Sequence, residues 1–258
     1  MLVFYFTATG NSLYVARRLG GTSASIPRLL AGGKREFADE AIGFVFPCHG
    51  FGVPRMVAEF LRQSRFAANY FFAVMTYGNR SAAGLAQFDE LARAAGVVLD
   101  YTNEILMVDN YLPWFAVEAQ LRKTPGKNIA ENLANCVADI QARRCKPVRV
   151  GMAAKLFTRM AHPISEARHC DHGDERFSVL AGCNNCGVCA RVCPAGNIEV
   201  TDGPNFLHRC EGCFACLHHC PQRVLQVRGE RSAARFLNEH VRLDEIIRAN
   251  CRAAGEAQ

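Results

Sequence analysis

The stretch that decides the fold is residues 1–19, which read MLVFYFTATGNSLYVARRL. An apolar run at residues 2–6 leads into the short polar turn TATGNS and then into a segment whose apolar residues have helical spacing. A buried strand that enters a helix through a tight turn is typical of a parallel sheet covered by helices. Small and hydroxyl residues in the turn leave backbone N–H groups free to face an anion, and the helix N-terminus adds favourable partial charge. The stretch therefore predicts both a sheet type and an anion-binding loop.

The same alternation of strand and helix continues through the first half of the chain. The weakest strand signal follows the first helix and indicates a short edge strand. The expected strands are residues 2–6, 24–26, 42–46, 70–75 and 105–108, and the expected helices are residues 12–19, 53–61, 82–95 and 128–142. This pattern predicts a parallel α/β sheet with helices on both faces.

Residues 173–230, called the cysteine block below, hold eight of the thirteen cysteines in an internal repeat of 27 residues. The first copy reads CNNCGVCARVCP and the second CEGCFACLHHCP, so both follow C-x₂-C-x₂-C-x₃-C-P. A single CxxC would leave zinc open, but two full copies with their prolines are typical of a protein with two [4Fe–4S] clusters. Because no secretory signal is evident, disulfides are the weaker alternative.

The spacing also assigns the ligands crosswise between the clusters. Three cysteines of each copy wrap one face of a cluster, while the proline directs the fourth toward the other cluster. The first set is then Cys183, Cys186, Cys189 and Cys220, and the second is Cys210, Cys213, Cys216 and Cys193.

The residue before the second cysteine of each copy is Asn185 or Gly212. A backbone that curls around sulfur often needs a positive φ there, and these residue types tolerate it. We expect an apolar shell around the clusters, formed by Ile198, Val200, Phe206, Phe214, Leu225 and Val227.

Two more loops follow predicted strands of the first half. Open α/β sheets bind ligands at the carboxyl ends of their strands, and glycines there allow close backbone approach. The turn after the first strand is called the first loop (residues 7–12), and these two loops are called the second loop (47–52) and the third loop (76–79). The candidate cofactor-binding residues are Thr7, Ala8, Thr9, Gly10, Asn11, Ser12, Pro47, Cys48, His49, Gly50, Phe51, Gly52, Thr76, Tyr77, Gly78 and Asn79.

The first loop resembles the S/T-x-T-G-N-S/T phosphate loop of flavodoxins, and the cysteine block resembles bacterial two-cluster ferredoxins. Nearly the whole chain, including LDEIIRAN at residues 243–250, is similar to flavodoxin–ferredoxin fusion proteins of bacteria and archaea. The resemblance implies a flavodoxin-like doubly wound parallel five-stranded sheet, order 2-1-3-4-5, with a small α+β two-[4Fe–4S] ferredoxin-like domain. It also implies FMN on the three loops, with Phe51 and Tyr77 beside the flavin ring and residues 109–114 closing one side.

We predict four parts of the chain. Residues 1–147 form the flavodoxin-like domain, 148–172 a connector, 173–230 the ferredoxin domain and 231–258 a helical tail. Within the connector, a short helix at residues 152–160 is expected to stop before Pro163, because proline cannot donate the next helical hydrogen bond.

Several reactive side chains outside the motifs have a functional and a structural interpretation. Cys48 is either a redox thiol beside the cofactor or, as we favour, a tolerated small residue. The tract HCDH at residues 169–172 is either a metal site or, as we favour, part of a solvated linker. His218 and His219 either tune a cluster or lie at the surface. We expect Trp114 to serve packing, and Cys136, Cys145 and Cys251 to be buried or neutral thiols on helices.

Composition adds few constraints. Hydrophobic residues make up 50% and charged residues 21%, as in ordinary globular proteins. No apolar run is long enough for a transmembrane segment, and the first residues lack the pattern of a signal peptide, so we expect a cytoplasmic protein. The net charge of +6 comes with no nucleic-acid motif, and either a solvated surface or an acidic protein partner explains it.

These observations predict an intracellular electron-transfer protein that relays electrons between FMN, two [4Fe–4S] clusters and redox protein partners. One alternative is a flavin-dependent oxidoreductase that acts on a quinone or a similar small oxidant, with an open pocket beside His49 and Tyr77. Another is a ferredoxin whose flavodoxin-like half binds no flavin and serves for docking. No pyridine-nucleotide site is evident, because residues 50–52 lack the third glycine and the acidic partner of that fingerprint.

Overall fold

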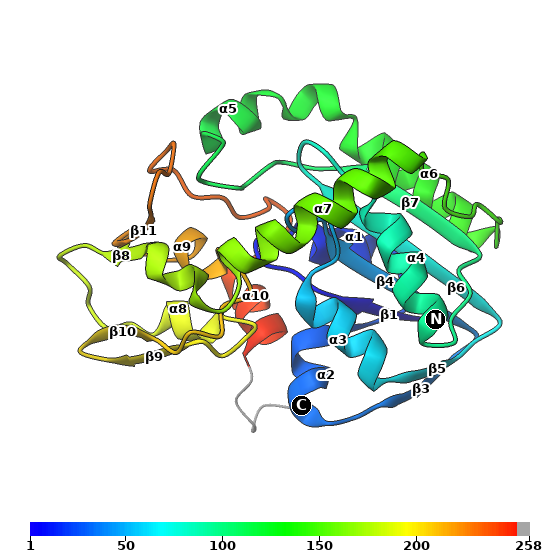
Figure 1. Cartoon of the computed structure of the whole chain (residues 1–258), viewed down its shortest axis with the longest axis horizontal. Coiled ribbons are helices and arrows are strands. Elements are labelled where there is room, and N and C mark those ends of the chain that lie inside the picture. Colours follow the sequence, from blue (N-terminus) through cyan, green and yellow to red (C-terminus); the bar gives the residue numbers. More distant parts are fainter. Residues whose placement is uncertain (252–258) are drawn as a thin grey trace.

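The computed structural model describes residues 1–251, and residues 252–258 lie outside the described part. A layered α/β body holds the first half of the chain, and a smaller α+β unit beside it holds the cysteine block (Figure 1). Among residues 1–251, no helix combines the length and the hydropathy needed to cross a lipid bilayer.

The body is built on five parallel strands in the order β2-β1-β4-β6-β7. Counted along the chain within this sheet, the order is 2-1-3-4-5, so the predicted flavodoxin-like fold class is confirmed. The strand bounds are β1 Leu2–Tyr5, β2 Thr22–Ser25, β4 Ala41–Pro47, β6 Tyr70–Tyr77 and β7 Tyr101–Leu106. The last strand begins before the expected residues 105–108, because its first half pairs with β6 through polar and aromatic residues rather than an apolar run.

Alternation along the strands divides the core into two layers. Val3 and Tyr5 pack with helices α1 and α6, whereas Phe4 and Phe6 pack with α2, α3 and α4 on the opposite face. A glycine is required at position 43 of β4, because a Cβ there would lie 2.0 Å from the Phe72 ring. The helix bounds are α1 Asn11–Leu19, α2 Ile26–Gly32, α3 Arg55–Gln63, α4 Gly84–Ala94 and α6 Ile129–Gln141.

The remaining elements of the first half lie at its edges. A small parallel pair, β3 and β5, is separate from the main sheet, and α5 and a 3₁₀ turn follow the last strand. Their bounds are β3 Glu36–Ala38, β5 Arg65–Ala67, α5 Val117–Arg122 and η1 Thr124–Lys127.

The cysteine block forms two antiparallel strand pairs, β9 with β10 and β8 with β11, and two one-turn helices. Its interior contains Cys193 and Cys216 among apolar side chains, and Val108 and Leu112 from the segment after β7 complete it. The bounds are η2 His172–Arg176, β8 Phe177–Val179, α8 Val188–Arg191, β9 Ile198–Thr201, β10 Gly203–Phe206, α9 Ala215–His218 and β11 Leu225–Val227.

The segment expected to be a connector with a helix at residues 152–160 forms the longer helix α7, Met152–His169. Pro163 lies inside this helix and does not end it, so the expected stop was wrong. Its ring is exposed, and contacts with other parts of the chain hold the helix on both sides of the missing N–H, through Thr158 with Ala83 and through His169 with Tyr111. Figure 1 shows α7 crossing the front of the molecule from α4 toward the cysteine block.

The described part of the predicted tail ends in α10, Leu243–Asn250. Ile246 and Ala249 belong to the core around α1, and the Asn250 side chain is fully buried. Asn250 Nδ2 donates to the carbonyls of Thr7, at 3.0 Å, and Val192, at 3.1 Å. The end of the described chain therefore contacts both the sheet and the cysteine block.

Candidate cofactor sites

A cavity of about 400 Å³ lies at the carboxyl ends of β1, β4 and β6. All candidate residues of the first, second and third loops line it except Gly10 and Gly52. The opposite side of the cavity comes from α7 and from the second cysteine repeat, including Glu211, Cys213 and Phe214. The three loops are thus brought together, and a proposed cluster ligand shares their cavity.

The first loop presents hydrogen-bond donors to this cavity. Within residues 1–251 the backbone N–H groups of Ala8 and Thr9 have no acceptor, and the first turn of α1 has no side-chain cap. Thr7 Oγ1 accepts from the N–H of Gly10 at 3.1 Å, which fixes the turn. Buried donors without protein acceptors at a helix N-terminus suit a phosphate, so these residues fit the phosphate group of FMN.

The outer side of the first loop is covered by distant parts of the chain. The backbone N–H of Asn238 donates to the Thr9 carbonyl at 2.9 Å, and His219 Nε2 donates to the Ala8 carbonyl at 2.9 Å. Asn238 Nδ2 also donates to Asn11 Oδ1 at 3.0 Å. The carbonyls are satisfied from outside, so the N–H groups are left on the cavity side.

The second loop is a tight turn held by α7. Gly50 and Phe51 have φ values of 51° and 72°, and His49 and Gly52 exchange backbone hydrogen bonds across the turn. Thr158 Oγ1 donates to the Phe51 carbonyl at 3.2 Å, and His162 Nδ1 donates to the Gly50 carbonyl at 3.1 Å. A positive φ is unfavourable for an aromatic residue, so α7 stabilises a loop shape that the sequence alone disfavours.

Cys48 lies in the same loop, and its surroundings make the thiol unreactive. Its Sγ donates to the Ser81 carbonyl at 3.6 Å, and burial raises the pKa of the thiol to about 12. A protonated thiol is a poor nucleophile, which agrees with the favoured interpretation of a tolerated small residue.

Lys127, which the sequence did not indicate, holds the third loop together with Asp109. The buried Lys127 ammonium donates to the carbonyls of Gly78, at 3.2 Å, and Met107. A Cβ at Gly78 would lie 2.5 Å from Asp109, so this glycine permits a close approach. Burial raises the pKa of Asp109 and lowers that of Lys127. Asp109 begins the segment 109–114 that was expected to close one side, whereas Lys127 belongs to no motif and no sequence signal identified it.

A histidine–tyrosine pair forms the wall contributed by α7 and the segment after β7. His169 Nδ1 donates to the Ser165 carbonyl at 2.8 Å, which leaves Nε2 to accept from the Tyr111 hydroxyl at 2.6 Å. Burial lowers the pKa of His169. The expectation that residues 169–172 form a solvated linker is therefore wrong at His169, because the helix carries it into the cavity.

Trp114 was expected to serve packing, and this was wrong in part. Its ring contacts Phe51 and Tyr111, with ring centroids 6.2 and 5.3 Å apart, but 58% of the side chain is exposed. It lies at the rim of the cavity rather than in the core.

The eight repeat cysteines separate into two neighbourhoods. Cys183, Cys186, Cys189 and Cys220 line one small cavity in the cysteine block. Cys193 interacts electrostatically with Cys210, Cys213 and Cys216, each of which has its thiol pKa raised by burial. All thirteen cysteines are free thiols. These neighbourhoods correspond to the two crosswise sets, and thiols without disulfides fit iron–sulfur ligation.

The local backbone also fits sulfur ligation. Asn185 and Gly212 have φ values of 55° and 67°, so the expected positive φ is confirmed at both positions. Backbone N–H groups point at sulfur: Asn197 N lies 3.3 Å from Cys193 Sγ, and Gly212 N lies 3.3 Å from Cys210 Sγ. Such donors stabilise negative charge on a thiolate and tune a cluster's potential.

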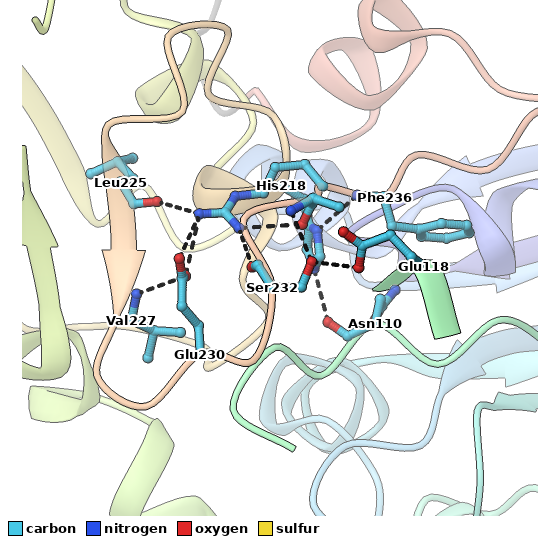
Figure 2. Close-up of polar contacts among 10 residues, drawn as sticks. Asn110, Glu118, His218, Leu225, Val227, Glu230, Ser232 and Phe236 are labelled. Atoms are coloured by element: carbon cyan, nitrogen blue, oxygen red, sulfur yellow. Dashed lines mark hydrogen bonds and ion pairs between the residues drawn. The ribbon is translucent and has the colours of Figure 1, made fainter. Parts of the chain in front are cut away.

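His218 and His219 are buried, so surface placement is excluded. His218 Nε2 donates to the Asn110 carbonyl at 2.9 Å, and its Nδ1 accepts from the N–H of Phe236 at 3.1 Å (Figure 2). Burial lowers the pKa of His218 to about 3, and it also lowers the pKa of His219. Both rings link the helix that precedes Cys220 to loops of the sheet.

Figure 2 also shows the polar contacts that hold the segment around His218. Arg235 donates to the Leu225 carbonyl at 2.9 Å and pairs with Glu230 at 3.3 Å, both largely buried. Ser232 Oγ donates to a carboxylate oxygen of Glu118, on α5, at 2.6 Å. The segment after β11 is thereby fixed against α5 and the cysteine block.

The other cysteines and histidines have mixed outcomes. Cys136 is fully buried on α6 as expected, but Cys145 is exposed and outside any helix, and Cys251 follows the end of α10. His172, the last residue of the tract at 169–172, lies at the surface beside Glu175 and His208, with ligand atoms within 4.8 Å of one another. No other residue of that tract belongs to this group.

No protein-family model matches the chain. A curated relative, one component of an ion-translocating oxidoreductase complex from Methanosarcina acetivorans, is 40% identical over 64 residues. The match covers 22% of this chain and 23% of the relative, so the chain spans about a quarter of that protein's length.

Two solved structures share a limited likeness with this chain. A protein from Bacteroides uniformis, named as a putative flavoprotein, is 14% identical with a TM-score of 0.32, and the match covers 47% of this chain and 94% of that one. The two-electron reduced flavodoxin of Megasphaera elsdenii is 14% identical with a TM-score of 0.35, covering 54% and 99%. Neither is close enough to support an inference, and the fold class rests on the strand order of the sheet.

Proposed function

We propose that the chain is an electron-transfer protein that relays electrons between FMN, two [4Fe–4S] clusters and redox protein partners. One observation carries this proposal. The cavity lined by the first loop is also lined by Cys213, a ligand of the second proposed cluster. A flavin there and that cluster would be separated by little more than the loop of residues 211–214, which favours direct transfer between them.

The residues present suit these groups. The N–H groups of Ala8 and Thr9 and the start of α1 would hold the phosphate, and the second and third loops would border the ring. The two cysteine sets would hold the clusters. When bound, FMN exchanges one or two electrons and each cluster exchanges one.

The chain's own contribution is to position these groups and limit water. Phe214 is 5% exposed and packs against Tyr111, with ring centroids 5.5 Å apart, beside the loop that separates the two sites. The neutral His218 and His219 fix the cysteine block against the sheet through carbonyl acceptors, so the separation of the sites is set by buried hydrogen bonds. The oxidoreductase complex to which the curated relative belongs agrees with an electron-transfer role at the general level.

The test begins with cofactor analysis of anaerobically purified protein. We expect one FMN and about eight irons and eight sulfides per chain. Light-driven reduction of the flavin should then bleach cluster absorbance at a rate independent of protein concentration. Stoichiometric zinc without sulfide would overturn the cluster assignment. Clusters without any FMN binding at high micromolar flavin would favour the ferredoxin with a flavin-free docking half.

A second candidate is a flavin-dependent oxidoreductase for a quinone or similar oxidant. The observation that favours it is the extension of the cavity beyond the three loops to the His169–Tyr111 pair and the exposed Trp114. Steady turnover of a soluble quinone that falls in Tyr111→Phe, with FMN and iron content unchanged, would support this candidate. Equal turnover by both proteins would return the assignment to the electron carrier.

A further inference from the structure

On α7 the buried side chains are polar and the exposed ones are largely apolar, which is the reverse of the usual surface helix. The two buried residues of α7 are polar, Thr158 and His162, and both bind the second loop. Of the large apolar side chains that residues 1–251 leave exposed, five lie on this one helix. They are Met152, Leu156, Phe157, Met160 and Ile164. A soluble monomer normally turns such a face inward, so an exposed one marks an interaction surface.

The exposed side chains form a continuous band. Met152, Leu156, Met160 and Ile164 follow each other at intervals of four residues, so they advance by about 40° per step and span about 120° of the helix. They are 80%, 59%, 64% and 70% exposed, respectively. The Phe157 ring lies beside Phe51, with centroids 5.0 Å apart, and Phe51 in turn contacts the exposed Trp114. An indole at the edge of an apolar band is typical of the interface between water and lipid.

Basic residues border the band on both sides. On the helix, Lys155 and Arg159 lie on one border and Arg168 on the other. Arg159 and Arg168 have no ion-pair partner among residues 1–251, and Arg80 lies over the Phe157 ring at 5.4 Å. Two carboxylates lie near this border, Glu166 at 3.7 Å from His162 and Glu90 at 4.0 Å from Lys155, with side chains 35% and 70% exposed. The four basic side chains outnumber them. The border is therefore complementary to a negatively charged surface.

We propose that α7 is a membrane-docking helix that lies flat on an anionic lipid surface, with Met152, Leu156, Met160 and Ile164 among the acyl chains. Its basic border then lies at the level of the lipid headgroups. A helix with an apolar band, basic flanks and a neighbouring Trp has the composition of interfacial helices, which bind by apolar burial and attraction to anionic lipid. The inference rests on the exposed face of α7 and not on the proposed electron transfer.

Charge decides against a second copy of the chain as the occupant. A two-fold contact through α7 would place the two basic borders near each other, and the two carboxylates beside each border already face His162 and Lys155. The band lies on a single helix that crosses the front of the molecule (Figure 1). A flat lipid surface contacts such a straight band along its whole length.

The docking would have a consequence for the cavity. Ile164, Arg168 and Trp114 belong both to this face and to the cavity lining. A lipid surface on α7 would therefore lie at the cavity rim, where a lipid-soluble oxidant has direct access.

The test is sedimentation of anaerobically purified holoprotein with vesicles of phosphatidylcholine, alone or mixed equally with phosphatidylglycerol. We expect binding to the mixed vesicles, weakened by salt, and little binding to phosphatidylcholine alone. Leu156→Glu should reduce binding at least about tenfold, because it removes a leucine that docking would bury in lipid and adds a repelled charge. Arg159→Gln should reduce it about fivefold.

The matched control is Val98→Glu, because Val98 is as exposed as Leu156, at 59%, but lies after α4 and not on α7. Iron and flavin content and circular dichroism should be unchanged in all variants. The proposal would be overturned if Leu156→Glu and Val98→Glu reduced binding equally. It would also be overturned if the wild-type protein did not bind anionic vesicles. Self-association in sedimentation velocity that Leu156→Glu abolishes, without vesicle binding, would assign the face to a second copy. Binding of a purified acidic flavodoxin with the same dependence, again without vesicle binding, would assign it to a protein partner.

Discussion

The sheet and the cysteine block bury their interiors in different ways. The sheet and its covering helices share a layer of aromatic side chains, in which Phe4 contacts both Phe44 and Phe60 and all three are fully buried. The cysteine block has strands of three or four residues, and its interior includes Cys193, Cys210 and Cys216. The sheet therefore forms its site at loops that the strand order already places, whereas the cysteine block would complete its core with the clusters proposed for it.

Removing the proposed iron should have the largest effect, because it should affect the cysteine block and leave the sheet intact. We expect amides of β8 to β11 to exchange at rates near those of an unfolded chain after anaerobic chelation, because the thiols and short strands leave too little apolar core. Amides of β1, β4 and β6 should stay protected, because the one proposed ligand at their core, Cys213, is only partly buried at its edge. Hydrogen exchange measured by mass spectrometry checks this. Equal loss of protection in both regions would show that they fold as one unit.

Exchanging single cysteines sharpens the comparison within the block. Cys193→Ser should damage the cluster of Cys210, Cys213 and Cys216, although it is closer in sequence to the first set, because those are the thiols it interacts with. Electron paramagnetic resonance of the reduced protein should show one altered cluster and one intact one. Cys145→Ser, at an exposed non-ligand thiol, is the matched control and should leave both signals unchanged. Damage confined to the cluster of Cys183, Cys186 and Cys189 would contradict the crosswise assignment.

Substitutions in the first loop test the other side of the comparison. Thr9→Ala should weaken FMN binding about ten- to a hundredfold, by removing a hydroxyl beside the phosphate donors. Gly10→Val should do worse, because Gly10 has φ of 98° and a Cβ there would lie 3.0 Å from Asn238 and Val241. Titration of apo-protein with FMN, followed by flavin fluorescence, measures both. Thr9→Ala should keep its full iron content, and equal binding by all three proteins would move the phosphate elsewhere.

The sequence was sufficient where local rules decide the structure. Alternating apolar strands with helical stretches predicted the sheet, and repeat spacing separated the cysteines into the two sets that the structure places apart. The positive φ at Asn185 and Gly212 followed from the same local reasoning. These features depend on neighbours in the chain, which a sequence displays directly.

It was insufficient where distant contacts decide. Pro163 ends a helix by the local rule, yet tertiary contacts of α7 carry the helix through it. For His218 and His219 the sequence left cluster tuning and surface placement open, and the structure buries them against loops more than a hundred residues away. The cover of the first loop by Asn238 and Asn250 also lacks any periodic or motif signal, because it depends on the side-chain amides of these two residues and one backbone N–H.

The last expected effect concerns the contact between the second loop and α7, where His49 lies near His162 and His169. Burial, reinforced by these two rings, lowers the pKa of His49 to about 4, whereas an unfolded histidine titrates near 6.5. The unfolded chain therefore takes up a proton in this range and the folded chain does not, so stability present above about pH 6.5 is lost as pH falls toward 4. The loss from this group is at most about 3 kcal/mol in the free energy of unfolding. Urea unfolding followed by Trp114 fluorescence between these pH values should show that His49→Gln flattens the dependence. The matched control, His240→Gln, removes an imidazole that is 53% exposed and should keep the wild-type slope. An unchanged slope in His49→Gln would mean that other groups cause the loss of unfolding free energy at low pH.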